Sequence, residues 1–275
     1  MSTTDPVSAP ASAVAPGPRR RILWPILLFL VVSAIASPLL AMAQDASRID
    51  PDFLRLTVLS TAVGAAAVAL AWRLRLPFPP VTRRGWATPL AGSLVAVGLF
   101  ALVMLALAAA QHAKWPGADL AKLGGAGLPL FLAAQVVGAG AEEVGWRGLV
   151  QPLLELRLPR LAAALVTGAL FAVGHVFLLP AVGPGPFALF CVSAVAVSVT
   201  LAAFTIGYSP VARVAIATWL HFLTNMATFV LFADGDGSAR YFADSAVAGA
   251  LVALAAWLAL RRAFVAAPAP EKMLR

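Results

Sequence analysis

Long apolar stretches without a charged residue constrain this chain more than any other feature of its sequence. The stretch from Ile22 to Ala43 contains no charged residue. A helix of about 20 apolar residues, rising about 1.5 Å per residue, crosses a hydrocarbon core of about 30 Å. Hydrophobic residues make up 61% of the chain and charged residues 12%, which is more apolar surface than a soluble fold can bury. The sequence therefore predicts an integral membrane protein.

Eight predominantly apolar stretches predict an all-α membrane fold of about eight transmembrane helices. They run from Ile22 to Ala43, Phe53 to Trp72, Ala87 to Ala110, Leu128 to about Leu156, Leu161 to Leu179, Phe187 to Phe204, Pro210 to Phe232 and Ser245 to Leu260. The first stretch has a second interpretation as a cleaved signal peptide, because Ala41-Met42-Ala43 resembles a cleavage site. Its length favours an uncleaved helix.

The helices suggest four segments of the chain. Residues 1–21 are rich in Ser, Thr, Ala and Pro, which predicts a disordered tail. Residues 22–127 hold the first three predicted helices, residues 128–232 the next four, and residues 233–275 the last helix and a tail. The polar residues discussed below all fall in 128–232, which is the predicted catalytic core.

The net charge of +8 is explained by membrane orientation rather than by nucleic-acid binding. Lys and Arg lie at the ends of the apolar stretches, and positive charge concentrates on the cytoplasmic side of membrane proteins. Cation-rich segments alternate with cation-poor ones along the chain. This alternation predicts that both termini are cytoplasmic, in what we expect to be a bacterial plasma membrane. The single cysteine, Cys191, excludes an intrachain disulfide and a cysteine metal cluster.

Ionisable side chains inside the predicted helices are few and point to a site. Each costs at least a few kcal/mol in the bilayer and is normally kept for function or pairing. Glu142, His175 and His221 each lie 12 to 15 residues from the predicted cytoplasmic end of their helix. At about 1.5 Å per residue, all three lie on the order of 20 Å deep. Three polar groups at one depth on three helices can converge on one site.

Spacing separates the roles of the two adjacent glutamates. Glu143 and Arg147 are four residues apart, so they share a helix face and predict an ion pair that makes their burial tolerable. Glu142 points about 100° away from Glu143. A carboxylate without its own cation in a low-dielectric site suits proton exchange with water. Glu142 is therefore the candidate general base.

The remaining polar residues can supply the other functions that amide hydrolysis needs. His175 and His221 can orient the water, donate a proton to a leaving amine or hold a metal. Asn225, one turn after His221, can offer an amide N–H to a developing oxyanion. An alternative is that these groups form only an interhelical polar clamp.

At these residues the chain resembles the CPBP family, which includes the type II CAAX prenyl proteases and bacteriocin-immunity (Abi) relatives. The family motifs Glu-Glu-x-x-x-Arg, Phe-x-x-x-His and His-x-x-x-Asn match at Glu142, Glu143 and Arg147, at Phe171 and His175, and at His221 and Asn225. The resemblance implies a bundle of eight helices like that of CAAX proteases, with a catalytic cavity open to the cytoplasmic side. It also implies that Glu142 activates water beside His175 and His221. The predicted catalytic residues are Glu142, Glu143, His175, His221 and Asn225, with Arg147 and Phe171 in support.

The resemblance implies an intramembrane endopeptidase that acts on a membrane-embedded or lipidated peptide or protein. A cofactor is left open: either none, or a divalent metal such as zinc held by Glu142, His175 and His221, which are not spaced as His-Glu-x-x-His on one helix. Two other functions are considered. One is a non-catalytic scaffold or self-immunity factor, and the other is a proton- or ion-coupled transporter, for which no internal repeat is found.

The charge pattern predicts the orientation of the two termini. Reporter tags fused to the first and to the last residue should both be labelled only from the cytoplasmic side, because cation-rich segments alternate along the chain. Accessibility labelling of sealed and permeabilised cells measures this. A terminus labelled from outside would overturn the count of eight and revive the cleaved-signal alternative with seven helices.

Overall fold

The computed structural model describes residues 19–47, 49–50, 53–72, 81–83, 85–112, 127–232 and 238–265. Within these ranges the chain forms helices and no strand. Most of the predicted disordered tail, residues 1–18, lies outside the described residues, as does the C-terminal tail from residue 266. The described part of the molecule is therefore an all-α bundle.

The bundle consists of α-helices interrupted by short 3₁₀ and π segments. In chain order they are α1 (Arg19–Ser47), η1 (Leu56–Leu59), α2 (Ser60–Trp72), α3 (Ala87–Ala110), α4 (Gly127–Gly145), η3 (Trp146–Val150), α5 (Gln151–Glu155), α6 (Arg160–Gly174), η4 (Val176–Leu178), α7 (Leu179–Val182), α8 (Pro184–Thr205), α9 (Pro210–Phe232) and α10 (Ala239–Val265). The segment η3 is π-helical, and η1 and η4 are 3₁₀-helical.

Two predicted helices have the predicted bounds, and others differ at their ends. The predictions for α3 and α9 are confirmed at both ends. Helix α1 is longer than its prediction and begins at Arg19, within the predicted tail. Helix α10 begins at Ala239 rather than Ser245 because Asp244, which we placed in a loop, is buried and accepts a hydrogen bond of 2.9 Å from Gln111 on α3.

The predicted helix from Leu128 to about Leu156, with a bend allowed near Pro152, is confirmed in its extent, but it is not α-helical throughout. The α-helix ends at Gly145, a π turn follows, and Pro152 lies in the first turn of α5. Proline lacks an N–H and clashes with the carbonyl four residues earlier. Widening the preceding turn relieves this clash, and π turns are the form in which helices absorb one extra residue.

The predicted helix from Leu161 to Leu179 also breaks. Helix α6 ends at Gly174, and the chain bends by 42° before η4 and α7 continue. At the break, the Nδ1 of His175 hydrogen-bonds the carbonyl of Phe171 over 2.9 Å. The break therefore falls at a residue of the predicted site.

Five helices in the described residues are long and apolar enough to cross a membrane, and six if the bent pair at Gly174 counts as one span. The five are Ile22–Ser47 of α1, α3, α8, α9 and α10. Helices α2 and α4 do not qualify, because α2 has 13 residues and α4 carries two glutamates among its 19. The chain is thus an all-α membrane protein, and the predicted count of eight spans is not confirmed.

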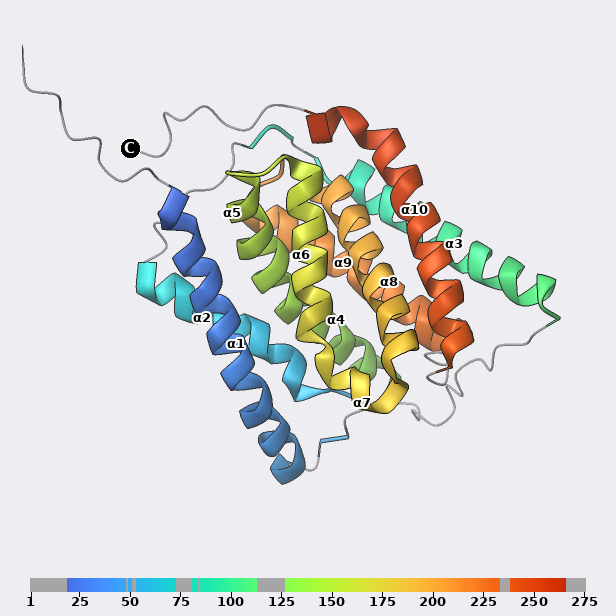
Figure 1. Cartoon of the computed structure of the whole chain (residues 1–275), viewed down its shortest axis with the longest axis horizontal. Helices are drawn as coiled ribbons and strands as arrows, with labels where there is room; N and C mark the ends of the chain where they lie inside the picture. Colours follow the sequence, from blue (N-terminus) through green and yellow to red (C-terminus); the bar gives the residue numbers. More distant parts are fainter. Residues whose placement is uncertain are drawn as a thin grey trace, which may run out of the picture.

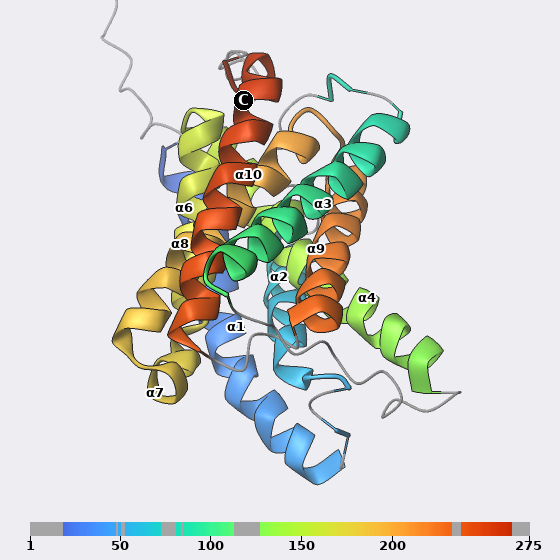
Figure 2. The same cartoon turned by 90° about the vertical axis from the view of Figure 1, so that its right-hand side faces the viewer.

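The site-bearing helices occupy the middle of the bundle. Figure 1 shows α1 and α2 on one flank, α3 and α10 on the other, and α4, α6, α8 and α9 between them. Figure 2 shows that α3 crosses the other helices obliquely, where it packs against α9 and α10. Large apolar side chains such as Leu70, Val95 and Val211 are exposed on the outside, as expected for surfaces that face lipid.

Glycines allow some of these helices to approach closely. A Cβ atom added at Gly168 of α6 would lie 2.7 Å from the backbone Cα of Val195 and from the Cβ of Ser198, both on α8. Ser198 is fully buried there and donates a hydrogen bond of 2.8 Å to the carbonyl of Ala164. Small residues at membrane helix interfaces let backbones pack in this way. The contact fixes α6, which carries the site to be described, against α8.

We expect Gly168→Ala to destabilise the bundle, because the new methyl group meets backbone that cannot move aside cheaply. Overpacking of this kind costs about 1–3 kcal/mol. The measurement is the thermal unfolding midpoint of purified protein in detergent. Gly98→Ala on α3 is the matched control, since a Cβ there meets nothing within 4 Å, and its midpoint should stay the same or rise. Equal midpoints for the two variants would contradict the packing argument.

Candidate active site

The polar residues predicted to converge do so between α4, α6 and α9. These three helices lie in the middle of the bundle (Figure 1), and α4 packs directly against α9. Glu142 lies near both imidazoles: its two carboxylate oxygens are 4.0 Å from Nε2 of His175 and 3.5 Å from Nε2 of His221. The predicted convergence of Glu142, His175 and His221 from three helices is confirmed.

Glu143 is the anchored member of the glutamate pair. Its side chain is fully buried, and Oε1 accepts a hydrogen bond of 3.1 Å from Arg147. The predicted ion pair is therefore confirmed. The same oxygen lies 2.8 Å from Nδ1 of His221, a contact that we did not predict. A buried carboxylate needs such charged and hydrogen-bonding partners, because leaving it unpaired in a low-dielectric interior is very unfavourable.

Glu142 lies in a more open environment than Glu143. The side chain of Glu142 is 11% exposed, against 0% for Glu143, and the side chains of His221 and His175 are 13% and 23% exposed. Adjacent residues on a helix point about 100° apart, which lets one glutamate be sealed while the next reaches an accessible surface. The accessible group of three is thus Glu142, His175 and His221.

The hydrogen bonds of the two imidazoles determine which ring nitrogens are free. The carbonyl oxygen of Phe171 can only accept, so Nδ1 of His175 donates to it. The carboxylate of Glu143, already paired with Arg147, accepts in the same way from Nδ1 of His221. In the neutral rings the lone pair is then on Nε2 of each histidine. Both lone pairs face Glu142.

Phe171 holds the two imidazoles in place. Its ring centroid is 4.4 Å from that of His175 and 6.4 Å from that of His221, and 5.8 Å from that of Trp146. Trp146 in turn contacts Phe29 of α1, with centroids 5.1 Å apart. Aromatic rings at these separations pack favourably. The site therefore rests on α1 as well, which places the first helix within the folded bundle.

Two other predicted features, a role for the Asn225 amide and a metal site, have less support in the structure. Asn225 lies one turn beyond His221 on α9, and its carbonyl accepts a hydrogen bond of 2.9 Å from Thr228. Among the described residues, no hydrogen bond joins its amide to the other site residues. Glu142, His175 and His221 have the donor types that suit zinc, but no group of three His, Cys, Asp or Glu in the described part of the chain has the geometry of a metal site.

Sequence analysis missed a second buried ion pair near the site. Arg213 of α9 donates to both oxygens of Glu155 over 2.9 and 2.7 Å, and to the carbonyl of Tyr208 over 3.2 Å. Gln151 donates to Glu155 over 2.9 Å. Arg213 fits the pattern of cations at the ends of the apolar stretches, which predicts a place among the cytoplasmic cations, but it is only 2% exposed. The four-residue spacing of Glu143, Arg147, Gln151 and Glu155 was the signal that could have revealed this row.

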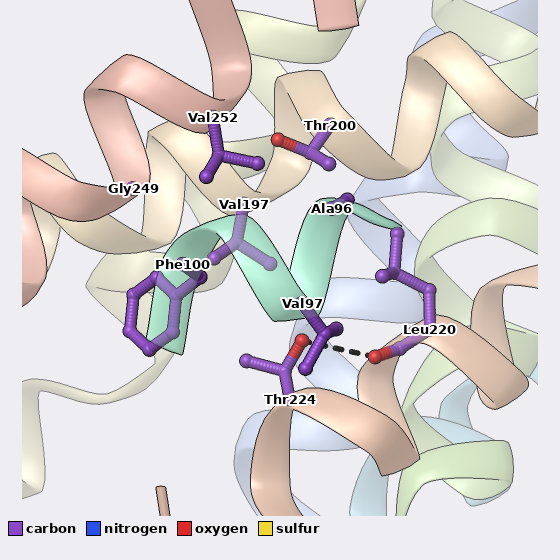
Figure 3. Close-up of a pocket in the computed structure, with 9 residues that line it drawn as sticks. All are labelled: Ala96, Val97, Phe100, Val197, Thr200, Leu220, Thr224, Gly249 and Val252. Atoms are coloured by element: carbon purple, nitrogen blue, oxygen red, sulfur yellow. Dashed lines mark hydrogen bonds between the residues drawn. The ribbon is translucent and has the colours of Figure 1, made fainter. Parts of the chain in front are cut away.

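A separate apolar cavity lies on another side of α9. It is small, with a volume of about 20 Å³, and is formed by α3, α8, α9 and α10, with lining residues Ala96, Val97, Phe100, Val197, Thr200, Leu220, Thr224, Gly249 and Val252 (Figure 3). Its two hydroxyl groups, on Thr200 and Thr224, donate to carbonyls of their own helices. None of the lining residues is ionisable, so the cavity lacks the groups for hydrolysis.

Comparison with known proteins points to one family. Residues 124–227 match the family model described as type II CAAX prenyl endopeptidase Rce1-like. The matched segment begins just before α4 and ends within α9, so it includes all the predicted site residues. No protein with a curated description matches the chain.

We expect Arg147→Ala to lower the stability of the protein as well as any activity, because it leaves Glu143 without its cation. Removing one partner of a buried ion pair costs about 3–5 kcal/mol. The measurements are the yield of folded protein and its unfolding midpoint. Arg262→Ala, at an exposed arginine in the last turn of α10, is the control and should change neither. A normal yield and midpoint for Arg147→Ala would show that this arginine is not a structural partner.

Proposed function

Residues 124–227 match the family model of type II CAAX prenyl endopeptidase Rce1-like, and we propose that the chain is a CAAX-type intramembrane protease in which Glu142 activates a water molecule for peptide-bond hydrolysis. The substrate class is a membrane-embedded or lipidated peptide or protein. The proposed residues are Glu142 as general base, His175 and His221 as its partners, and Asn225 as a donor to the oxyanion. Glu143, Arg147 and Phe171 hold these groups in position.

One observation carries the proposal: the accessible carboxylate faces two imidazole nitrogens that are free to accept. Three acceptors that face one another are stabilised by a donor between them, and a water molecule has two protons to donate. Oxygen-to-nitrogen distances of 3.5 and 4.0 Å allow one water to bond to the carboxylate and to an imidazole together. Glu143 is sealed and already paired, which leaves Glu142 as the base.

In the proposed reaction the water oxygen forms a bond with the peptide carbonyl carbon while Glu142 takes one proton. Negative charge develops on the carbonyl oxygen, where the amide of Asn225 or a protonated imidazole can donate a hydrogen bond. Glu142 then returns the proton to the amide nitrogen as the carbon–nitrogen bond breaks. The products are a carboxylic acid and an amine, and the glutamate is regenerated.

We further propose that both termini face the cytoplasm, with the site entered from that side. In Figure 1 the beginning of α1 and the end of α10 lie at the same end of the bundle. At that end Arg160 at the start of α6 donates to the carbonyl of Ala263 in α10. Cations gathered at one end of a bundle favour the cytoplasmic side.

The family match favours a peptidase over the two alternatives that the sequence also allowed, a transporter and a non-catalytic scaffold or immunity factor. A cluster of polar side chains inside the membrane is compatible with a peptidase, a transporter or a scaffold. A peptidase that uses a general base requires a carboxylate that is not paired with a cation, and a scaffold does not. The arrangement of Glu142 beside a sealed Glu143–Arg147 pair supports that requirement.

We expect Glu142→Gln to reduce peptide cleavage by at least the roughly 10² to 10⁴ that general-base catalysis usually supplies, because the amide cannot accept the water proton. Folding should be unchanged, since the side chain keeps its shape. The measurement is cleavage of a library of prenylated and unprenylated peptides by purified protein in detergent or proteoliposomes. His175→Ala and His221→Ala should be comparably damaging, and the double variant far from additive.

The same assay with and without a chelator separates two ways of activating water. Cleavage that survives thorough chelation favours activation by the Glu142 carboxylate alone. Loss that is restored by zinc would assign Glu142, His175 and His221 as ligands. Full biological activity of both Glu142→Gln and His175→Ala would contradict the peptidase proposal and support a scaffold.

A further inference from the structure

Four buried polar side chains follow one another at four-residue intervals from the active site toward the end of α5. They are Glu143, Arg147, Gln151 and Glu155, and all four are at most 4% exposed. The first and last of them contact α9, Glu143 through His221 and Glu155 through Arg213. The two contacts link the same two parts of the chain at separate points.

In a continuous α-helix this row could not face a single neighbour. Twelve residues at about 100° each place Glu155 about 120° around the helix from Glu143. The π segment Trp146–Val150 lies between them. One extra residue in a turn sets the following positions back by about 100°, which brings Glu155 to within about 20° of Glu143. The π turn therefore aligns both residues toward α9.

The segment is also packed against α9 between these two contacts. A Cβ atom at Gly148 would lie 2.9 Å from a side-chain methyl of Val214. Val214 follows Arg213 directly, and Arg213 and His221 lie eight residues apart on the unbroken helix α9. One contact between two helices leaves them free to pivot, whereas two contacts about two turns apart restrict both rotation and sliding.

We propose that the Glu155–Arg213 ion pair is a positioning device for the active site: it fixes the register of η3 and α5 on α9, and so holds His221 on Glu143 with its Nε2 toward Glu142. Glu155 and Arg213 are positioning residues, since neither contacts Glu142 or His175. The bidentate geometry, with distances of 2.9 and 2.7 Å, suits this role because it specifies direction as well as distance.

The test removes the pair without leaving an unpaired buried charge. In Glu155→Gln/Arg213→Met both charges are absent, and replacing a buried ion pair by uncharged residues often leaves stability unchanged. The role in catalysis rests on the proposed peptidase function, so a second readout independent of activity is needed. A disulfide between α4 and α9 provides it.

Gly140 and Thr218 are the positions for that disulfide. A Cβ atom at Gly140 would lie 3.6 Å from both Cγ2 and Oγ1 of Thr218, so cysteines at the two positions are within bridging reach. All crosslinking variants also carry Cys191→Ala, which removes the native cysteine. In this background Gly140→Cys/Thr218→Cys should crosslink rapidly on mild oxidation, and adding Glu155→Gln/Arg213→Met should slow crosslinking at least fivefold.

Without the cysteines, the paired variant should keep its unfolding midpoint and its KM within twofold while kcat falls at least tenfold. Arg213→Lys, which retains one charged hydrogen bond, should give an intermediate kcat. The control is Gln111→Met/Asp244→Asn, which removes a part-buried hydrogen bond of 2.9 Å between Gln111, the residue that follows α3, and Asp244 of α10. It should leave kcat and the crosslinking rate unchanged.

The outcomes separate this inference from the proposed function. Slower crosslinking with lower kcat supports the positioning role, and slower crosslinking in a protein that cleaves no peptide at all supports it while overturning the peptidase proposal. If the paired variant crosslinks as fast as the Gly140→Cys/Thr218→Cys protein that keeps Glu155 and Arg213, the inference is overturned, whatever happens to kcat. An equal effect of the Gln111→Met/Asp244→Asn control overturns it too, because the slower crosslinking and lower kcat would then follow from weakening of the helix packing in general.

Discussion

The burial of Glu143 is the constraint on which the rest of the site depends. A carboxylate with no exposed surface among membrane helices is tolerated only with charged or hydrogen-bonding partners. Arg147 on the same helix supplies the charge, and His221 on α9 supplies a second donor. Satisfying this one side chain therefore fixes α4 against α9 and determines the orientation of the His221 ring, which leaves Nε2 free to face Glu142.

The residues that sequence reasoning predicted best are those whose position depends on helix geometry alone. The depth of Glu142, His175 and His221 follows from a constant rise per residue, and the Glu143–Arg147 pair follows from four-residue spacing. The structure confirms the ion pair, and it confirms that the other three side chains meet. The contact of His221 with Glu143 could not be predicted in this way, because rise gives depth but not the rotation of α9 relative to α4. Since Glu142 and Glu143 lie at nearly the same height along α4, depth alone does not indicate which of them His221 contacts.

The features that sequence reasoning missed arise where one helix departs from regular geometry. Pro152 indicated a bend, yet the sequence does not say whether a helix relieves a proline by kinking or by a π turn. The choice matters, because only the π turn brings Glu155 round to α9. Arg213 fits the pattern of cations at the ends of the apolar stretches, so the charge pattern alone did not indicate that it is buried against Glu155.

The neighbouring glutamates show how one helix can provide both a rigid and a reactive carboxylate. In Glu143 one oxygen, Oε1, accepts hydrogen bonds from both Arg147 and His221, and the other, Oε2, is buried away from water. A base must instead keep an oxygen free and accessible to water. Two adjacent positions about 100° apart on a helix separate these requirements: Glu143 faces the cation and α9, and Glu142 faces the imidazoles. The orientation of Glu142 toward the imidazoles is thus a consequence of the burial of Glu143.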